Sequence, residues 1–506
     1  MKRIFAVILI ISMCLGLFMG CKGNDDISLD DDTIRIAILD EFLKLSQIPR
    51  ESGHVRAVSN YLKVWATEND FKAVRDKYNN IIINKPASNG YENSPTTILQ
   101  CHMDMITVVE EGVIFNPLYD SIKVVNDGEI LVAEGTNLGA DNGLGVATAL
   151  YILKNAEKHG PIRVIITVDG ETTRLGAEKL DSKYLKGDYL INLDWESHRS
   201  IGNGSAGTTS FVISRDITWV KPKNTVAYDL SISGLTGGDS GKNINDGGAN
   251  AIKIIGETLA KMQGAGILFE LASFNGGITK NTIPTDAIVL VIINDSDIKK
   301  FNSIFNSSLN VFKDTYGSIE KNYSFTYTEA VMPKKVLSTE DSTRIVSFLY
   351  GIVNGVQSKS SKNIVESSSN IGTVSTKTGD FISEVYTRSS SEEMAQKITG
   401  EHEAISTICD LKYRFKVSSP GWSTNPDGLL IPTLSDIYFN IYNEKMSIET
   451  VHIEHECGWF AFKNPDLEIA SIGNLIHNPN STEETITLKS ITKPATVILT
   501  FLEQTR

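Results

Sequence analysis

The sequence predicts an α/β fold in which a mostly parallel sheet forms one domain, interrupted by an inserted α+β domain. Three short apolar runs, at 96–104, 162–170 and 188–194, are bounded by Gly and polar residues, as buried parallel strands are. A helical pattern at 144–159 separates the first two runs. This alternation is typical of βαβ units.

The remaining elements follow from the same periodicities. Residues 34–68 predict two amphipathic helices interrupted by Ile48-Pro49-Arg50, and 79–85 predicts a strand. After Asp194 the pattern changes to strands at 228–235 and 286–294, helices at 249–262 and 297–316, and a second similar cycle at 321–390. From about 392 the pattern returns to a helix, a strand at 412–417 and a helix near 434–445.

A chain of 506 residues should hold more than one domain. We expect the first domain to be split into 34–207 and 392–506, with an inserted α+β domain at 208–391. This division would bring the C-terminal part of the chain back to the first sheet.

The N-terminus resembles a bacterial lipoprotein signal. Lys2 and Arg3 precede an apolar run from 4 to 19, and Gly20-Cys21 follows. We therefore expect residues 1–21 to be a signal peptide, 22–33 a linker, and a lipidated Cys21 to tether the protein to a membrane of the cell envelope. An uncleaved anchor is the alternative.

Composition limits the partners. The chain has 48 basic and 61 acidic residues, a formal charge of −13, which argues against nucleic acid because phosphate binding requires a basic surface. The three cysteines beyond residue 21 do not form the spaced pairs of a disulfide framework.

Acidic residues and a histidine follow the predicted strands where each one ends. In α/β sheets, ligands bind beyond the carboxyl ends of the strands, so these side chains should meet. Each alone could be a cap or a core histidine. With one residue from the C-terminal part, the expected metal ligands are His102, Asp141, Glu171, Asp194 and His452.

This mixture of imidazole and carboxylate suits Zn²⁺, with Co²⁺ or Mn²⁺ as alternatives. Five donors can hold two ions if a carboxylate such as Asp141 bridges them. Asp104, two residues after His102, could orient that imidazole.

Several motifs together resemble the aminoacyl-histidine dipeptidases (Xaa-His dipeptidase, peptidase D), a family of two-zinc exopeptidases. The resemblance extends from about 40 to 490 and includes Ser46 to Arg50, His102-Met103-Asp104-Met105, Thr136 to Gly143, Ile191 to Asp194, Lys280 to Pro284, Arg388-Ser389-Ser390, Pro420-Gly421-Trp422 and His452 to Gly458.

The resemblance implies a zinc-exopeptidase-like catalytic domain with the inserted domain at 208–391 as its lid. It also implies hydrolysis of Xaa-His and other unblocked dipeptides, and it is compatible with a homodimer. It implies that Asp141 bridges the ions, that His102 and Asp194 complete one ion site, and that Glu171 and His452 complete the other. Arg388 would grip a substrate carboxylate, or would be a solvated charge.

The sequence departs from the family pattern at three positions. Gly170 stands where the family has its general base, Asp239 where it has a histidine that steadies the oxyanion, and Gly248 where it usually has an arginine. Two hypotheses remain: a hydrolase with altered chemistry, in which Asp169 or another group replaces the base, or a metal-binding pseudopeptidase that holds peptides or amino acids. We expect Gly170→Glu to restore part of the activity.

Overall fold

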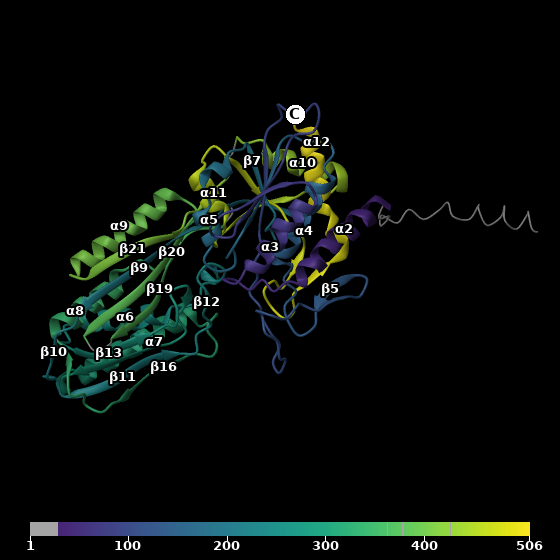
Figure 1. The fold of residues 1–506 in the computed structure, drawn as a ribbon. Coiled ribbons are helices and arrows are strands. Elements are labelled where there is room, and N and C mark those ends of the chain that lie inside the picture. The colour runs from purple at the N-terminus through teal and green to yellow at the C-terminus, as the bar shows by residue number, and fades with distance from the viewer. Residues whose placement is uncertain (1–28, 362, 377–378, 426) are drawn as a thin grey trace, which may run out of the picture.

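The computed structural model describes residues 29–361, 363–376, 379–425 and 427–506, which form two α/β units lying side by side (Figure 1). The first unit contains the chain up to about residue 206 and its C-terminal part, and the second contains the segment between them. The predicted α/β architecture with an inserted second unit is confirmed.

The first sheet is mixed, with parallel strands at its centre. Strands β6, β3, β7 and β24 run parallel, while β1, β2, β8 and β22 pair antiparallel at the flanks, and β23 lies parallel to β8. Their order is β1 (Lys72–Arg75), β2 (Ile81–Lys85), β6 (Ile162–Thr167), β3 (Thr97–His102), β7 (Tyr189–Asn192), β24 (Glu468–Ser471), β8 (Ser200–Ser205) and β22 (Trp422–Ser423), with β23 (Ser447–Val451) beside β8.

Successive residues of the central strands enter two different cores, because side chains alternate across a sheet. Leu99 and Cys101 belong to one core, and Ile98, which precedes Leu99, belongs to the other. The first core is covered by α2 (Leu29–Ser46), α3 (Arg56–Glu68), α4 (Ala140–Asn155), α10 (Leu430–Tyr442) and α12 (Thr492–Gln504). The second is covered by α5 (Leu175–Lys179) and α11 (Cys457–Lys463). Burial on both faces explains the continuous apolar runs in the sequence.

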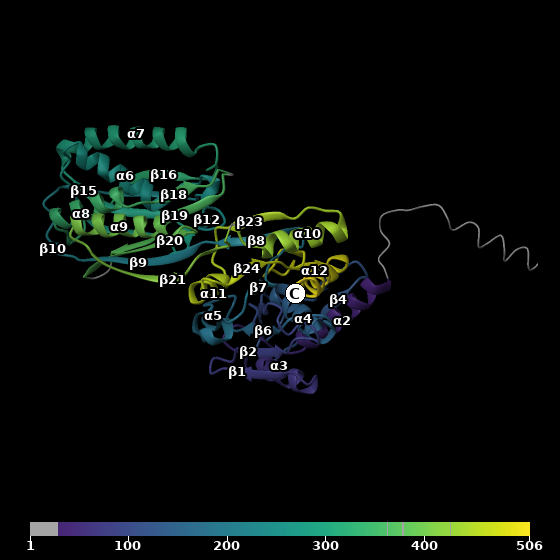
Figure 2. The ribbon, with the colours of Figure 1, turned by 90° about the horizontal axis from the view of Figure 1, so that it is seen from above.

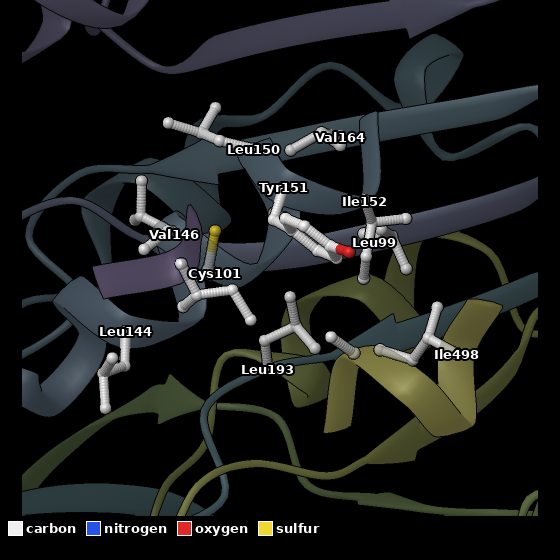
Figure 3. Packing of buried hydrophobic residues seen from close by; sticks show 14 of the residues in the cluster. Leu99, Cys101, Leu144, Val146, Leu150, Tyr151, Ile152, Val164, Leu193 and Ile498 are labelled. Atoms are coloured by element: carbon white, nitrogen blue, oxygen red, sulfur yellow. The ribbon is translucent and has the colours of Figure 1, made fainter. Parts of the chain in front are cut away.

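Helix α4 packs closely on this sheet. Figure 3 shows side chains of α4, among them Leu150 and Ile152, beside Leu99 and Val164 of the strands. A Cβ at Gly145 would lie 2.7 Å from the backbone oxygen of Leu193, so only glycine permits this approach. The first turn of α4, which carries Asp141, is thereby held near the end of β7.

The second sheet is antiparallel and has four helices packed with it (Figure 2). Its order is β16 (Ser324–Glu329), β11 (Val226–Ser233), β15 (Ala287–Ile293), β13 (Glu270–Gly276), β19 (Val365–Thr376), β20 (Asp380–Ser389), β9 (Gly207–Asp216) and β21 (Lys412–Ser419), with β18 (Gly355–Lys359) beside β19. The helices are α6 (Ala251–Gly264), α7 (Ile298–Tyr316), α8 (Thr339–Gly351) and α9 (Glu392–Ile408).

The described residues also form three smaller sheets. They are β10 (Trp219–Val220) with β17 (Val336–Leu337), β12 (Gly238–Asp239) with β14 (Thr282–Ile283), and the four strands β25 (Ile476–His477), β26 (Thr485–Thr487), β5 (Ile130–Ala133) and β4 (Val124–Asn126).

Strand β21 lies in the second sheet, whereas we expected it in the returning part of the first domain. It pairs with β9 from Lys412↔Ser214 to Ser419↔Thr208. The chain returns to the first sheet only with β22, which pairs with β8. We infer that the inserted unit runs from about 207 to 419 rather than ending at 391.

Candidate metal centre

Polar side chains from several strand ends converge at the carboxyl edge of the first sheet. His102 is the last residue of β3, Asp141 lies in the first turn of α4, and Glu171 follows β6. One donor atom from each of these three residues lies within 4.8 Å of the other two. Nε2 of His102 is 3.4 Å from Oδ1 of Asp141 and 3.4 Å from Oδ1 of Asp194, which follows β7. Four of the five expected ligands therefore lie together.

Asp104 lies on the other side of the imidazole. Its Oδ1 is 3.4 Å from Nδ1 of His102, and its backbone oxygen is 3.1 Å from the same nitrogen. The carboxylate also accepts hydrogen bonds from the backbone N–H of Gly170 (2.9 Å) and from the hydroxyl of Ser52 (2.6 Å). These contacts fix Asp104 against Nδ1 of His102, so Nε2 of the same imidazole points at the cluster. This is the geometry of a residue that orients a metal-binding histidine.

The turn that carries Asp141 is held by two buried charged residues that the sequence did not reveal. The carboxylate of Glu484 accepts from the backbone N–H groups of Gly139 (3.0 Å), Ala140 (2.8 Å) and Asp141 (3.2 Å). The guanidinium of Arg50 donates to the backbone oxygen of Gly139 at 2.5 Å. A buried glutamate or arginine in a loop leaves no periodic pattern in the sequence. Only the structure therefore shows the role of Glu484 and Arg50 in holding this turn.

Asn480 is a further residue that the sequence reasoning missed. It lies in the loop between β25 and β26, and its Nδ2 donates to Oδ2 of Asp141 (3.2 Å) and Oε2 of Glu171 (3.1 Å). An asparagine in a polar loop carries no signal for such a contact.

The structure does not bring His452 into this cluster, so its role as a metal ligand stays a prediction. Nε2 of His452 lies 2.8 Å from the hydroxyl of Ser368 in β19. The cavity beside it is also lined by Asp194 and by His455. His455 is only 8% exposed, and within the described part of the chain its Nε2 has no hydrogen-bond partner. The loop that carries both histidines directs His452 toward β19 of the second sheet.

The electrostatics of the cluster indicate a place for a cation. Burial, reinforced by Asp141, raises the pKa of Glu171 to about 9. Burial also raises the pKa of Asp194 to about 7. Burial opposes the charged form of His102, but Asp194 and the neighbouring carboxylates raise its pKa well above the usual value. A divalent ion would replace these protons. Oε1 of Glu171, buried and without a hydrogen-bond partner among the described residues, also fits a metal ligand.

Gly170 has no side chain to offer at the position where we expected a general base. A Cβ at Gly170 would lie only 2.4 Å from Cγ of His102. Asp169, the proposed substitute, accepts a hydrogen bond from the backbone N–H of Gly53 at 2.8 Å. Its carboxylate is thus engaged by a loop outside the cluster.

A cleft of about 530 Å³ adjoins the Glu171 side of the cluster and is lined also by Asp239, Arg388 and Glu454. Arg388 is 6% exposed, and its nearest guanidinium nitrogen lies 3.6 Å from Oδ1 of Asp239. The same oxygen accepts from the backbone N–H of Gly241 at 2.7 Å. Asp239 therefore closes its own turn while it partly neutralises Arg388.

Residues 98–504 match Peptidase family M20/M25/M40, and the chain belongs to this family. The cytosol non-specific dipeptidase of Escherichia coli strain K12 is 29% identical over 472 residues, which are 92% of this chain and 96% of that protein. The crystal structure of aminoacylhistidine dipeptidase from Vibrio alginolyticus is similar with 32% identity and a TM-score of 0.85, covering 93% of this chain and 96% of that one. An aminopeptidase structure from Bacillus cereus, at 14% identity and a TM-score of 0.54, shares the fold over 93% of this chain and 98% of its own.

These similarities correct the expected location. We expected a lipid-anchored protein of the cell envelope, but the relative that aligns over 92% of the chain is a cytosol dipeptidase. No helix in the described part of the chain is long and apolar enough to cross a membrane. The expectation was wrong because it depended on a short apolar run before one cysteine, and residues 1–28, including Cys21, lie outside the described residues.

Proposed function

We propose that the protein is a metal-dependent dipeptidase with impaired turnover, acting on Xaa-His and other unblocked dipeptides. The observation that carries this proposal is the convergence of His102, Asp141 and Glu171 within 4.8 Å at the strand ends of a peptidase-family fold. The similarity to two dipeptidases over more than nine tenths of the chain supports the substrate class.

The residues present fit two divalent ions, with Zn²⁺ preferred and Co²⁺ or Mn²⁺ as alternatives. His102 and Asp194 would hold one ion, Glu171 would hold the other, and Asp141 would be shared. Ions bound there would polarise a peptide carbonyl and lower the pKa of a water between them. Asp104 keeps the imidazole of His102 in position, and Glu484 with Arg50 keeps the Asp141 turn in position.

Substrate binding is assigned to the cleft on the Glu171 side. Arg388 is the candidate for a substrate carboxylate, because its Nε is buried and has no hydrogen-bond partner among the described residues. Asp239 competes for the same guanidinium. We therefore expect Arg388 to bind a substrate carboxylate more weakly than an arginine without an acidic neighbour would.

The impaired turnover follows from position 170. A general base contributes typically about 10²- to 10⁴-fold to a rate, and neither Gly170 nor Asp169 places a carboxylate at the cluster. The crowding between position 170 and His102 also favours a second candidate function, a pseudopeptidase that binds dipeptides without cleaving them.

Hydrolysis of a set of dipeptides, including Xaa-His, tests the proposal. The native protein would be assayed with Zn²⁺, Mn²⁺ or Co²⁺ beside the Vibrio alginolyticus dipeptidase and the Asp141→Ala variant. We expect a rate lower than that of the Vibrio enzyme by about 10²- to 10⁴-fold and lost in the variant. Equal rates would refute the impairment. Dipeptide binding in calorimetry without any hydrolysis would establish the pseudopeptidase instead. A homodimer stays a prediction.

A further inference from the structure

Asp141 divides the cluster into two unlike halves. Its Oδ1 faces Nε2 of His102 at 3.4 Å, and the same nitrogen faces Asp194. Its Oδ2 faces the amide of Asn480 at 3.2 Å, and the same amide faces Glu171 at 3.1 Å. One half therefore contains an imidazole, whereas the other contains only carboxylates and an amide.

Asn480 is held in this position by its own loop. Its φ of 57° is in the left-handed region, which asparagine tolerates better than most residues. The backbone N–H of Glu484 donates to the oxygen of Ser481 within this loop. The carboxylate of Glu484 in turn binds the backbone of the Asp141 turn. The amide and Asp141 are thus fixed relative to each other by a common framework.

The carbonyl end of this amide has no hydrogen-bond partner in the part of the chain that the structure describes. Oδ1 of Asn480 and Oε1 of Glu171 are both buried without a hydrogen-bond partner within the described ranges. Buried polar atoms are normally paired, so each such atom calls for a cause. The two ends of an amide have nearly the same shape. Turning the group over would direct Oδ1, instead of Nδ2, at Asp141 and Glu171.

We propose that Oδ1 of Asn480, with Asp141 and Glu171, forms an all-oxygen site for a hard divalent cation of the Mg²⁺ or Mn²⁺ class. Carboxylate and carbonyl oxygens favour these ions, whereas imidazole favours Zn²⁺. The His102 half then keeps the zinc-class ion, and the Asn480 half binds its ion more weakly. Without a cation, the NH₂ group of Asn480 holds the two carboxylates together. This inference rests on the proposed metal dependence of the protein.

Ion binding, measured apart from turnover, tests the proposal. The full chain would be stripped with a chelator, reloaded with Zn²⁺, passed through a desalting column and analysed for metal content, then titrated with Mn²⁺ by electron paramagnetic resonance. We expect about one retained Zn²⁺ and one weaker Mn²⁺ site. Asn480→Ala should lower the Mn²⁺ affinity by at least about tenfold and leave the Zn²⁺ in place.

Two further variants make the result independent of any folding defect in Asn480→Ala. Asn480→Asp keeps the shape and adds a charged oxygen, so it should bind Mn²⁺ more tightly. Asn480→His supplies an imidazole and should raise the retained Zn²⁺ from about one to about two per chain. Asn478→Ala is the matched control, because Asn478 is exposed and has a similar φ of 48°, and it should change neither ion.

Two results would overturn the inference while leaving the proposed function intact. One is retention of two Zn²⁺ of equal affinity by the native protein, and the other is unchanged Mn²⁺ binding in Asn480→Ala. Absence of any bound ion from the native protein would instead refute the metal dependence itself.

Discussion

Gly170→Glu places a glutamate at the position where the family resemblance implies a general base. The structure changes what this substitution should do. A Cβ at position 170 would lie 2.4 Å from Cγ, 2.6 Å from Cβ and 2.7 Å from Cδ2 of His102, where ordinary contacts begin at 3.4 Å. The imidazole or the strand end must therefore move by about 1 Å, and such overpacking costs about 1–3 kcal/mol. Because a metal–nitrogen distance tolerates only about 0.2 Å, His102 would leave its ion.

We therefore expect both Gly170→Glu and Gly170→Ala to lower ion affinity by at least about tenfold and to lower the free energy of unfolding, without restoring activity. Metal analysis after dialysis, urea denaturation and a dipeptide assay would be run on both variants. Gly264→Ala is the matched control, since a Cβ there meets nothing within 4 Å. The reasoning is refuted if Gly170→Glu keeps its ions and hydrolyses dipeptides faster than the native protein.

Three further predictions concern the ionisable residues Asp141, Glu484 and His402. Asp141→Ala should remove both ions from the protein, as metal analysis would show, because both halves of the cluster share this residue; retention of either ion contradicts this. Glu484→Gln turns an amide N–H₂ toward backbone donors and should lower the free energy of unfolding, measured by urea denaturation, by about 2 kcal/mol. An unchanged urea midpoint would contradict the role of Glu484 in holding the Asp141 turn. Burial lowers the pKa of His402 from 6.5 to about 4, so stability is full above pH 6.5 and should fall by about 3 kcal/mol as the pH drops to 4. His402→Phe should flatten this dependence, and the exposed His477→Phe should not.

The sequence predicts an element well where a single physical cause, such as burial on both faces, determines its pattern of apolar residues. The strands ending near His102 and Asp194 are buried on both faces, so their apolar runs and the polar residues that end them are visible without a structure. For β21 the pattern predicts a strand but not its partner, because exposed edge residues such as Lys412 and Lys416 are compatible with either sheet.

The cluster was predictable only where donor type and strand end coincide. His452 belongs to a recognisable motif, but a motif does not determine which way its loop turns, and the loop directs this imidazole to Ser368. For Asn480 the difficulty is different. The residues around it in the sequence do not suggest a metal site, and its contact partner Asp141 is 339 residues away in the sequence. Such pairings depend on tertiary packing, which local patterns do not contain.

The dependence of the Asp141 turn on Glu484 has a consequence for biosynthesis. Domains form from the N-terminus as the chain is made, so β3, α4, β6 and β7 are synthesised long before the loop that carries Glu484 and Asn480. A nascent chain can therefore contain His102, Asp141 and Glu171 before the carboxylate of Glu484 is available to bind the backbone of the Asp141 turn. Full ion occupancy should come after translation has passed residue 484, which makes the loading of this protein a late event in its maturation.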